Sequence, residues 1–383
     1  MRIAIYSSPI DSIAKPTGVG RHIASMATEL AQLEDVEPVL LTSRASYENI
    51  QPHLNGVLSA IPVRYLPGPE RLSRAVLLGS RWFSVDRWAG PVDWVYSPKE
   101  QPVATRHAKL AVTLHDVLPF ERDVPGLPAT ATWSRRRWQM TMKRMLRRAD
   151  LIATVSQFTR SRLLTLFDGF DEDRIEVIGN GIAPVFFRSA AADDERVLDE
   201  YGLARHSYVV TVGSLTHRKN GPALLRLAKL LHEQGAGLEI LVAGRRHDED
   251  LVQEHANLCQ QNPNFPLRLL GYVPDDDLAA MLTHALVMLF PSRYEGFGIP
   301  VLEAMAAGAP VIGSRAAALP EVMGGAGLEV EGQDEQEIFD MITNLQGDAA
   351  LRGSLIARGL DRVAEFTWRR CAERLKTAMD ARS

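Results

Sequence analysis

Short β-prone runs alternate with helix-period segments along the whole chain, and the alternation falls into two separate series. This pattern is typical of parallel sheets covered by helices, because two parallel strands can only be joined by a crossover connection. The first series contains RIAIYSS, EPVLLTS, DWVYSP, LAVTLHD, DLIATVS and RIEVIGN, and the second contains SYVVTVGSL, LEILVAGRR, PLRLLGYV, ALVMLFPS and APVIGSR. A chain of 383 residues has room for two such domains. The sequence therefore predicts an α/β fold of two Rossmann-like, doubly wound domains that face a central ligand-binding cleft.

The domain boundary is expected near residue 187, where NGIAPVFFRSAAADDERV interrupts the pattern with Gly, Pro and small polar residues. We assign residues 1–186 to an N-terminal domain and 187–362 to a C-terminal domain. Residues 363–383 have a helical period and are expected to pack back on the N-terminal domain. The first helix is predicted from a one-sided apolar stripe: Ile23, Met26, Ala27, Leu30 and Leu33.

Composition excludes several classes of protein. The two cysteines, Cys259 and Cys371, cannot form a disulfide framework or a cysteine-based metal cluster. The N-terminal run lacks the core and cleavage pattern of a signal peptide. No uncharged window approaches the about 18 residues that a membrane span needs. We therefore expect a cytoplasmic protein.

The charge is divided unevenly. Residues 1–188 hold 24 Lys and Arg against 19 Asp and Glu, a balance of +5, and the remainder holds 19 against 28, a balance of −9. The most basic segment, residues 133–148, has seven basic and no acidic residues. It is either a helix that faces an anionic membrane surface, which would place the protein peripherally on the inner face, or a solvated helix whose aromatics enter the core. No nucleic-acid partner is predicted, because one basic helix without a recognisable motif is not a nucleic-acid-binding domain.

Two carboxylates lie in the apolar segment LFPSRYEGFGIPVLEAMAAGAPVI, where Glu295 and Glu303 have seven residues between them. Pro300 is expected in the first turn of a helix, with Glu303 in the same turn beside free backbone N–H groups. Gly296 and Gly298 allow backbone amides to approach a ligand closely. The two carboxylates either accept hydrogen bonds from sugar hydroxyls or cap helices.

A second candidate segment, TVGSLTHRKNGPALL, follows the first strand of the C-terminal domain. Arg218 and Lys219 are expected in the loop before a helix that Asn220 could cap. These cations either neutralise a diphosphate or are solvated surface charges.

Taken together, these motifs resemble those of retaining GT-B glycosyltransferases of group 1, also called family 4, which includes many mannosyltransferases. The resemblance rests on GSLTHRKN, PSRYEGFGIPVLEAMAAGAPVI and LPEVMGGAG in the second half, and on PTGVGRHI, VTLHDVLP, LIATVSQFT and VIGNGIAPVF in the first. It covers nearly the whole chain.

The resemblance implies a set of site residues. Those implied to act on the reacting groups are Glu295, Lys219, Arg218 and His115. Glu295 would contact the donor sugar, the two cations the diphosphate, and His115 the transferred sugar. The residues implied to bind the donor or border it are Gly296, Phe297, Gly298, Ile299, Glu303, Ser214, Gly18 and Gly20. Among these, Glu303 would hold the ribose and the loop with Gly18 and Gly20 would border the phosphates and the acceptor. Ser214 stands where many members have an arginine, and Arg218 is the candidate replacement for that cation.

The implied chemistry needs no cofactor beyond a nucleotide diphosphate sugar as co-substrate. Positive groups stabilise the departing diphosphate, so no metal is required, and no side-chain nucleophile is assigned. The DxD strings at Asp171, Asp248 and Asp275 are interpreted as helix starts or surface loops and not as metal ligands.

Three other functions are weighed against a transferase. An oxidoreductase is disfavoured, because Gly18 and Gly20 come too late after the first strand and Ile23 occupies the third glycine position. A GT-B sugar-nucleotide epimerase and a non-catalytic sugar-nucleotide-binding subunit stay as alternatives. HDVLP together with GSLTHRKN most resembles family members that use GDP-mannose. The resemblance therefore implies transfer of mannose from GDP-mannose to a saccharide or lipid-linked saccharide acceptor in cell-surface polysaccharide synthesis.

Overall fold

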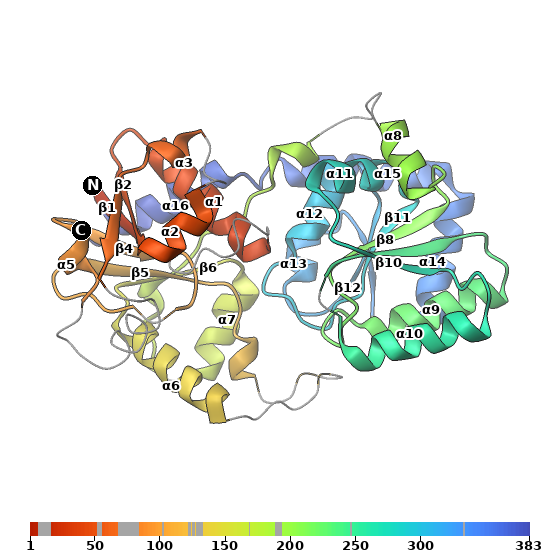
Figure 1. The fold of residues 1–383 in the computed structure, drawn as a ribbon, viewed down its shortest axis with the longest axis horizontal. Helices are drawn as coiled ribbons and strands as arrows, with labels where there is room; N and C mark the ends of the chain where they lie inside the picture. The colour runs from red at the N-terminus through yellow and green to blue at the C-terminus, as the bar shows by residue number, and fades with distance from the viewer. Residues whose placement is uncertain are drawn as a thin grey trace. The chain divides into compact units, whose positions relative to one another are not determined.

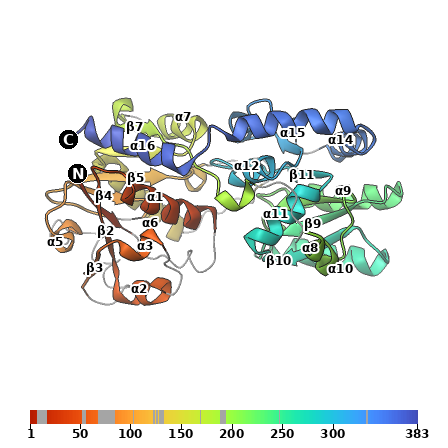
Figure 2. The ribbon, with the colours of Figure 1, turned by 90° about the horizontal axis from the view of Figure 1, so that it is seen from above.

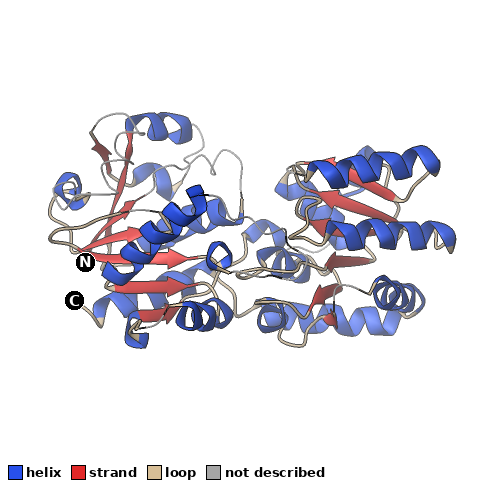
Figure 3. Cartoon of the chain, turned by 90° about the horizontal axis from the view of Figure 1, so that it is seen from below, coloured by secondary structure: helices blue, strands red, loops and turns tan. Residues whose placement is uncertain are grey.

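The structure is a computed structural model that describes residues 1–6, 17–51, 56–67, 84–101, 103–121, 124, 127, 133–167, 169–187, 194–245, 247–331 and 334–383. The chain divides into two compact units. Unit 1 comprises Met1–Glu121, Thr130–Gly181 and Thr367–Ser383, and unit 2 comprises Arg122–Ala129 and Ile182–Phe366. Each unit has its own parallel sheet with helices on both sides, as Figure 3 shows by the red strands lying between blue helices.

Unit 1 is built on a seven-stranded parallel sheet of order β3-β2-β1-β4-β5-β6-β7. Figure 1 labels β1, β2, β4, β5 and β6 of this sheet. Its strands are β1 Arg2–Tyr6, β2 Glu37–Ser43, β3 Val63–Leu66, β4 Trp94–Ser97, β5 Lys109–Leu114, β6 Leu151–Thr154 and β7 Ile175–Val177. Its helices are α1 Gly18–Ala31, α2 Arg44–Ile50, α3 Val57–Ala60, α5 Asp86–Ala89, α6 Trp133–Arg148, α7 Gln157–Leu166 and α16 Trp368–Asp380, with short 3-10 turns η2 Leu118–Phe120 and η3 Glu172–Arg174. The predicted stripe of α1 is confirmed, since Ile23, Met26, Ala27 and Leu30 are buried on one face and Leu33 is buried just after the helix.

Unit 2 is built on a six-stranded parallel sheet of order β10-β9-β8-β11-β12-β13. This is a doubly wound order: β9 and β10 are added on one side of β8, and β11, β12 and β13 are added on the other side. Its strands are β8 Tyr208–Val212, β9 Glu239–Ala243, β10 Leu267–Gly271, β11 Val287–Phe290, β12 Val311–Ser314 and β13 Leu328–Val330. Its helices are α8 Asp194–Tyr201, α9 Gly221–Glu233, α10 Glu249–Gln261, α11 Asp275–His284, α12 Ile299–Ala306, α13 Leu319–Met323, α14 Glu335–Gly347 and α15 Ala349–Val363, with the 3-10 turn η4 Pro184–Phe186.

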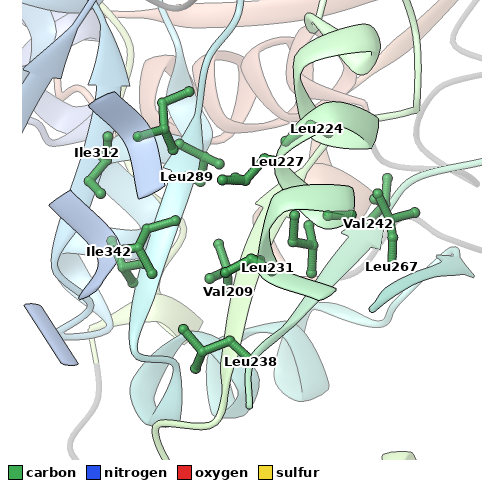
Figure 4. Packing of buried hydrophobic residues seen from close by; sticks show 14 of the residues in the cluster. Val209, Leu224, Leu227, Leu231, Leu238, Val242, Leu267, Leu289, Ile312 and Ile342 are labelled. Carbon is green, nitrogen blue, oxygen red and sulfur yellow. The ribbon is translucent and has the colours of Figure 1, made fainter. Parts of the chain in front are cut away.

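The core of unit 2 holds the β8 and β11 strand ends in place. Leu227 and Leu231 of α9 pack against Val209 of β8 and Leu289 of β11, and Ile342 of α14 completes the layer (Figure 4). Each fully buried aliphatic side chain of this kind contributes about 1.5–3 kcal/mol of transfer free energy. The strands therefore form a rigid base for the loops that follow them.

Helix α16 belongs to unit 1 although it follows unit 2 in the chain. It packs along α1 (Figure 2), with Trp368, Leu375 and Met379 buried. Gly181 meets the start of α16 so closely that a Cβ on Gly181 would lie 2.3 Å from the backbone nitrogen of Trp368. A side chain at position 181 is therefore incompatible with the observed packing.

The predicted strands all form, and two more, β3 and β13, were not predicted. These two have four and three residues, too few to show a clear apolar period. Among the described residues, no helix is long and apolar enough to cross a bilayer.

Candidate active site

The candidate site of unit 2 lies where its strand order reverses. Strands β8 and β11 are neighbours in the sheet, and their register pairs Val209 with Val287. Because both strands run in the same direction, the segments that follow them, residues 213–220 and 291–298, leave the same edge of the sheet. This edge is where doubly wound domains bind their ligands.

Three charged side chains from these two segments meet in one cluster. Arg218 Nη1 donates to Glu295 Oε1 at 2.8 Å, and Lys219 Nζ lies 2.8 Å from the same oxygen. The structure thus brings together Arg218, Lys219 and Glu295, which the sequence had assigned to one site. Lys219 Nζ also lies 4.1 Å from the centroid of the Phe290 ring, so an aromatic face contributes to holding the ammonium.

Burial and charge act in opposite directions on this cluster. Burial lowers the pKa of Lys219 to about 8, although Glu295 pulls it upward. Burial alone would raise the pKa of Glu295, but the attraction of Lys219 and Arg218 outweighs it and the net pKa lies below the usual value. At pH 7 Lys219 and Glu295 are therefore charged, and an arginine guanidinium keeps its charge in any protein. One carboxylate against two cations leaves an excess of one positive charge, which an anionic ligand can balance.

Two contacts with the backbone of the β11 side also hold Arg218, and the sequence did not predict them. Arg293 N–H donates to Arg218 O at 2.9 Å, and the guanidinium donates to Tyr294 O at 3.1 Å. Sequence reasoning did not assign roles to Phe290, Arg293 or Tyr294. Phe290 could have been found, because it ends the strand that leads into the site.

Gly296 and Gly298 lead directly into α12. Gly298 is the N-cap of α12 with φ of 104°, a left-handed conformation that favours glycine. A Cβ there would also lie 2.6 Å from Leu319 Cδ2. Phe297 is 6% exposed and Ile299 8% exposed, so both side chains are buried. Gly296 is buried with them.

Glu303 was predicted in the first turn of α12, and this prediction is wrong. The helix begins at Ile299, one residue before Pro300, because Gly298 in the left-handed region starts it there. Glu303 therefore falls in the second turn, where the backbone N–H groups are already bonded within the helix. Its side chain is 2% exposed.

The loop after β8 differs from expectation at one position. Asn220 stands at the N-cap of α9 but makes no side-chain capping bond, because its backbone adopts a left-handed conformation with φ of 59° and not the extended one that capping requires. Ser214 is half-buried in the same loop, two residues after the end of β8.

In unit 1, His115 follows β5 at the carboxyl edge of the sheet. Its Nε2 lies 2.9 Å from Pro98 O, and a carbonyl can only accept, so this nitrogen carries the proton. Burial lowers the pKa of His115, although the Pro98 bond opposes the shift. The ring is therefore neutral at pH 7, with Nδ1 as an acceptor.

A buried network of polar and ring contacts lies against His115. It connects two sequence motifs that the resemblance had noted separately. His22, from PTGVGRHI, contacts Asn180 Oδ1, from VIGNGIAPVF, at 2.8 Å. Its Nε2 lies 3.2 Å from the Tyr96 hydroxyl, and its ring stacks edge-on against His115 with centroids 4.6 Å apart. Burial holds the pKa of His22 well below the usual value. No local pattern in the sequence predicted that His22 and Asn180 are partners.

Gly18 and Gly20 lie in the first turn of α1 and not in a loop. Thr17 Oγ1 accepts the Gly20 N–H at 3.1 Å, which starts the helix at Gly18. Residues 7–16, the rest of the expected loop, lie outside the described residues.

The three DxD strings, which were interpreted as helix starts or surface loops, each lie at the start of a helix. Asp171 is the N-cap of η3, Asp248 is the N-cap of α10, and Asp275 is the first residue of α11. Within the described part of the chain, no three His, Cys, Asp or Glu side chains gather as a metal site.

Two family models together match most of the chain. The family model described as Glycosyltransferase Family 4 matches residues 16–186, and the one described as Glycosyl transferases group 1 matches residues 206–348. The O-antigen chain mannosyltransferase B of Escherichia coli is 30% identical over 379 residues, 97% of each chain. The chain belongs to the family 4 glycosyltransferases. Members of family 4 are retaining hexosyltransferases that use nucleotide-sugar donors, so the predicted family and enzyme class are confirmed.

Two further relatives extend the comparison of this family 4 enzyme. The serotype-specific mannosyltransferase WbdA of Escherichia coli is 27% identical over 61% of the chain, which spans 29% of the length of WbdA. The crystal structure of HepE of Anabaena in complex with UDP and glucose superposes with a TM-score of 0.74 at 17% identity, over 100% of both chains. The latter supports the GT-B fold, and with it the predicted fold class is confirmed.

Proposed function

We propose that this family 4 glycosyltransferase transfers mannose from GDP-mannose to a saccharide or lipid-linked saccharide acceptor in the synthesis of a cell-surface polysaccharide. The observation that carries the proposal is the cluster of Arg218, Lys219 and Glu295 at the reversal point of the unit 2 sheet, with its excess positive charge. The preference for mannose is supported by the names of the E. coli relatives, O-antigen chain mannosyltransferase B and WbdA.

In this proposal unit 2 binds the donor and unit 1 contributes the acceptor side. Arg218 and Lys219 contact the diphosphate, and the amides of residues 296–298 approach the sugar. Both cations contact Oε1 of Glu295, so Oε2 accepts from a sugar hydroxyl. Glu303 accepts from the ribose. Residues Ile299, Ser214, Gly18 and Gly20 border the donor, and His115 contacts the transferred sugar.

The mechanism follows from where charge develops. As the bond between the anomeric carbon and the diphosphate oxygen breaks, the electron pair stays on that oxygen and an oxocarbenium-like centre forms. Arg218 and Lys219, already fixed by Glu295, Phe290 and the carbonyl of Tyr294, stabilise the new negative charge without further rearrangement. The acceptor hydroxyl attacks from the face that the diphosphate leaves and gives its proton to a phosphate oxygen, so the configuration is retained. No metal ion is required in this scheme.

Thermal unfolding with GDP, UDP and dTDP is the experiment that tests the donor. A ligand that binds only the folded state raises the melting temperature by mass action, and we expect GDP to give the largest shift. A larger shift with UDP or dTDP contradicts the GDP-mannose assignment.

In the transfer assay we expect EDTA to leave the rate unchanged, and a loss that Mn2+ restores contradicts the metal-free scheme. Accumulation of an altered free sugar nucleotide indicates an epimerase, and binding without turnover indicates a non-catalytic subunit.

Donor binding is expected to weaken between pH 7 and pH 9. The pKa of Lys219 is lowered to about 8 by burial, so its positive charge is lost as the pH rises through that value. A nucleotide sugar carries a diphosphate that does not titrate in this range, which makes it a suitable probe for calorimetry. The Lys219→Arg variant, whose guanidinium stays charged, should give a flat profile. A wild-type affinity that is constant from pH 7 to pH 9 contradicts the role of Lys219.

Helix α6 supports the proposal of a membrane-associated acceptor. Met142, Met145 and Leu146 are buried and anchor the helix in unit 1. Arg136, Arg144, Arg147 and Arg148 are exposed, and Met140 is 57% exposed beside them. The side chains of both tryptophans lie outside the described residues. An anchored helix with a basic outer face suits the inner surface of an anionic membrane.

The triple variant Arg136→Ser, Arg144→Ser, Arg147→Ser is expected to lose binding to vesicles that contain anionic lipid, since each basic residue near such a surface contributes about 1 kcal/mol. Co-sedimentation with vesicles of phosphatidylglycerol and phosphatidylcholine measures this. Lys229→Ser, Arg358→Ser, Arg369→Ser is the control, because these exposed residues lie on α9, α15 and α16. Equal losses in both variants, or no loss in the first, exclude the α6 surface.

A further inference from the structure

A group of polar side chains outside the charged cluster holds the backbone of the loop after β8. It comes from the start of α10, where His247, Asp248 and Asp250 follow β9. The sequence analysis interpreted the Asp248 string as a helix start or a surface loop. Because β8 and β9 are adjacent and parallel, the segments that follow them leave the sheet side by side.

Three hydrogen bonds connect this group to the backbone of the loop. Leu215 N–H donates to His247 Nδ1 at 2.9 Å, and His217 N–H donates to Asp248 Oδ2 at 2.8 Å. In the reverse direction, Asp248 N–H donates to Leu215 O at 3.0 Å. A further contact joins the His217 ring to Asp250 at 2.8 Å. The loop is therefore fixed at two alternate residues, 215 and 217, directly before Arg218 and Lys219.

The contact between the two segments begins earlier, at a pair of glycines. Gly213 N–H donates to Ala243 O at 2.8 Å, and a Cβ on Gly244 would lie 2.5 Å from the carbonyl carbon and oxygen of Gly213. The two backbones thus approach as closely as glycine permits. This approach places His247 and Asp248 within reach of the loop.

His247 has the ionisation state that this contact requires. Its Nδ1 accepts a backbone N–H and therefore carries no proton. Burial lowers the pKa of His247, which favours the neutral ring, although Asp248 opposes the shift.

The loop is thus supported from two sides. On the β11 side, Glu295 and Tyr294 hold the charged ends of Arg218 and Lys219. On the β9 side, His247 and Asp248 hold the backbone that precedes them. The contacts on the β11 side are lost in part when a ligand competes for the two cations. The contacts on the β9 side hold backbone atoms and do not depend on the charge of the cations.

We infer that His247 and Asp248 are positioning residues that hold the β8–α9 loop in the conformation in which Arg218 and Lys219 meet the donor diphosphate. The inference rests on the proposed function of those two cations. It extends the donor site to a neighbouring strand whose residues touch no substrate. A loop that must be ordered at the moment of binding lowers the affinity for the ligand, so removing these contacts weakens binding without altering any charged group of the cluster.

The test compares variants that remove the side-chain acceptor of the Leu215 or His217 N–H group with variants that keep an acceptor there. His247→Leu and Asp248→Ala remove it, whereas His247→Asn and Asp248→Asn retain an oxygen near the original acceptor atom. Glu249→Ala is the control for lost negative charge at the start of α10, since Glu249 is exposed in the first turn. Two quantities are measured: deuterium exchange of the peptide that contains residues 213–219 without ligand, and the Kd for GDP.

We expect His247→Leu and Asp248→Ala to exchange faster over residues 215–217 and to bind GDP about five- to tenfold more weakly, the effect of about one lost hydrogen bond. The asparagine variants and Glu249→Ala should resemble the wild type in both measurements. Unchanged exchange in both removal variants overturns the inference. Faster exchange with unchanged GDP affinity also overturns it, provided that Lys219→Met, measured in parallel, does weaken GDP binding. If Lys219→Met leaves GDP binding unchanged as well, the failure lies in the proposed function of the cations.

Discussion

A Lys219→Met variant is expected to transfer sugar about 10²- to 10³-fold more slowly than the wild type, the usual loss when one preorganised donor to a developing anion is removed. Lys219 Nζ is held 2.8 Å from Glu295 Oε1, and its side chain is 14% exposed. The charge is therefore fixed in place and only weakly screened by water. Methionine has a similar length and no charge, so the change removes the cation with little change of volume. The measurement is kcat at saturating donor.

Stability must be separated from catalysis in this experiment. Removing one partner of a buried ion pair destabilises a protein by up to about 3–5 kcal/mol, because the remaining charge is left uncompensated. Here Arg218 still contacts Glu295, so the loss should be smaller. The melting temperature of the single variant, measured beside kcat, shows how much of the lost rate comes from unfolding. A single variant with kcat within threefold of the wild type contradicts the assignment of Lys219 to the leaving group.

The second large effect is expected at Gly181, where an alanine should destabilise unit 1. The added Cβ would lie 2.3 Å from Trp368 N and 2.6 Å from Trp368 Cγ, and the first of these contacts is with backbone that cannot rotate away. Helix α16 must shift, and the burial of Trp368 and Leu375 against unit 1 is disturbed. Overpacking of this severity costs about 3 kcal/mol or more. The melting temperature should fall by at least about 6 °C.

The control for this change is Gly353→Ala in α15, where nothing lies within 4 Å of an added Cβ. Alanine is the better helix former by about 1 kcal/mol, so this variant should melt at or above the wild-type temperature. Deuterium exchange in residues 368–380 locates the damage in α16. Equal melting of Gly181→Ala and the wild type indicates that the backbone approach at Gly181 relaxes without loss.

The sequence was sufficient for the parts of the fold that depend on local periodicity. The stripe of α1 was predicted because one face of the helix is buried. The apolar run that ends in Phe290 was predicted because every residue of that strand is buried. The cluster of Arg218, Lys219 and Glu295 could also be predicted, since each residue follows a strand and the carboxyl ends of neighbouring parallel strands share an edge.

Other features depend on conformation or on distant partners and gave no local signal. The place of Glu303 depends on the left-handed backbone of Gly298, which starts α12 one residue early. The failure of Asn220 to cap α9 depends in the same way on its own positive φ. The pairing of His22 with Asn180 and of His247 with Leu215 joins residues from different elements, and one sequence alone does not reveal such partners.

The return of α16 to unit 1 has a consequence for biosynthesis. Residues 367–383 are translated only after residues 182–366, so the first sheet leaves the ribosome before the helix that covers α1 has been made. Unit 2, by contrast, is nearly continuous in the chain and can close as soon as it emerges. Unit 1, most of which is synthesised first, therefore finishes folding last. Until α16 has been made, the apolar face that this helix covers is exposed to chaperones and proteases.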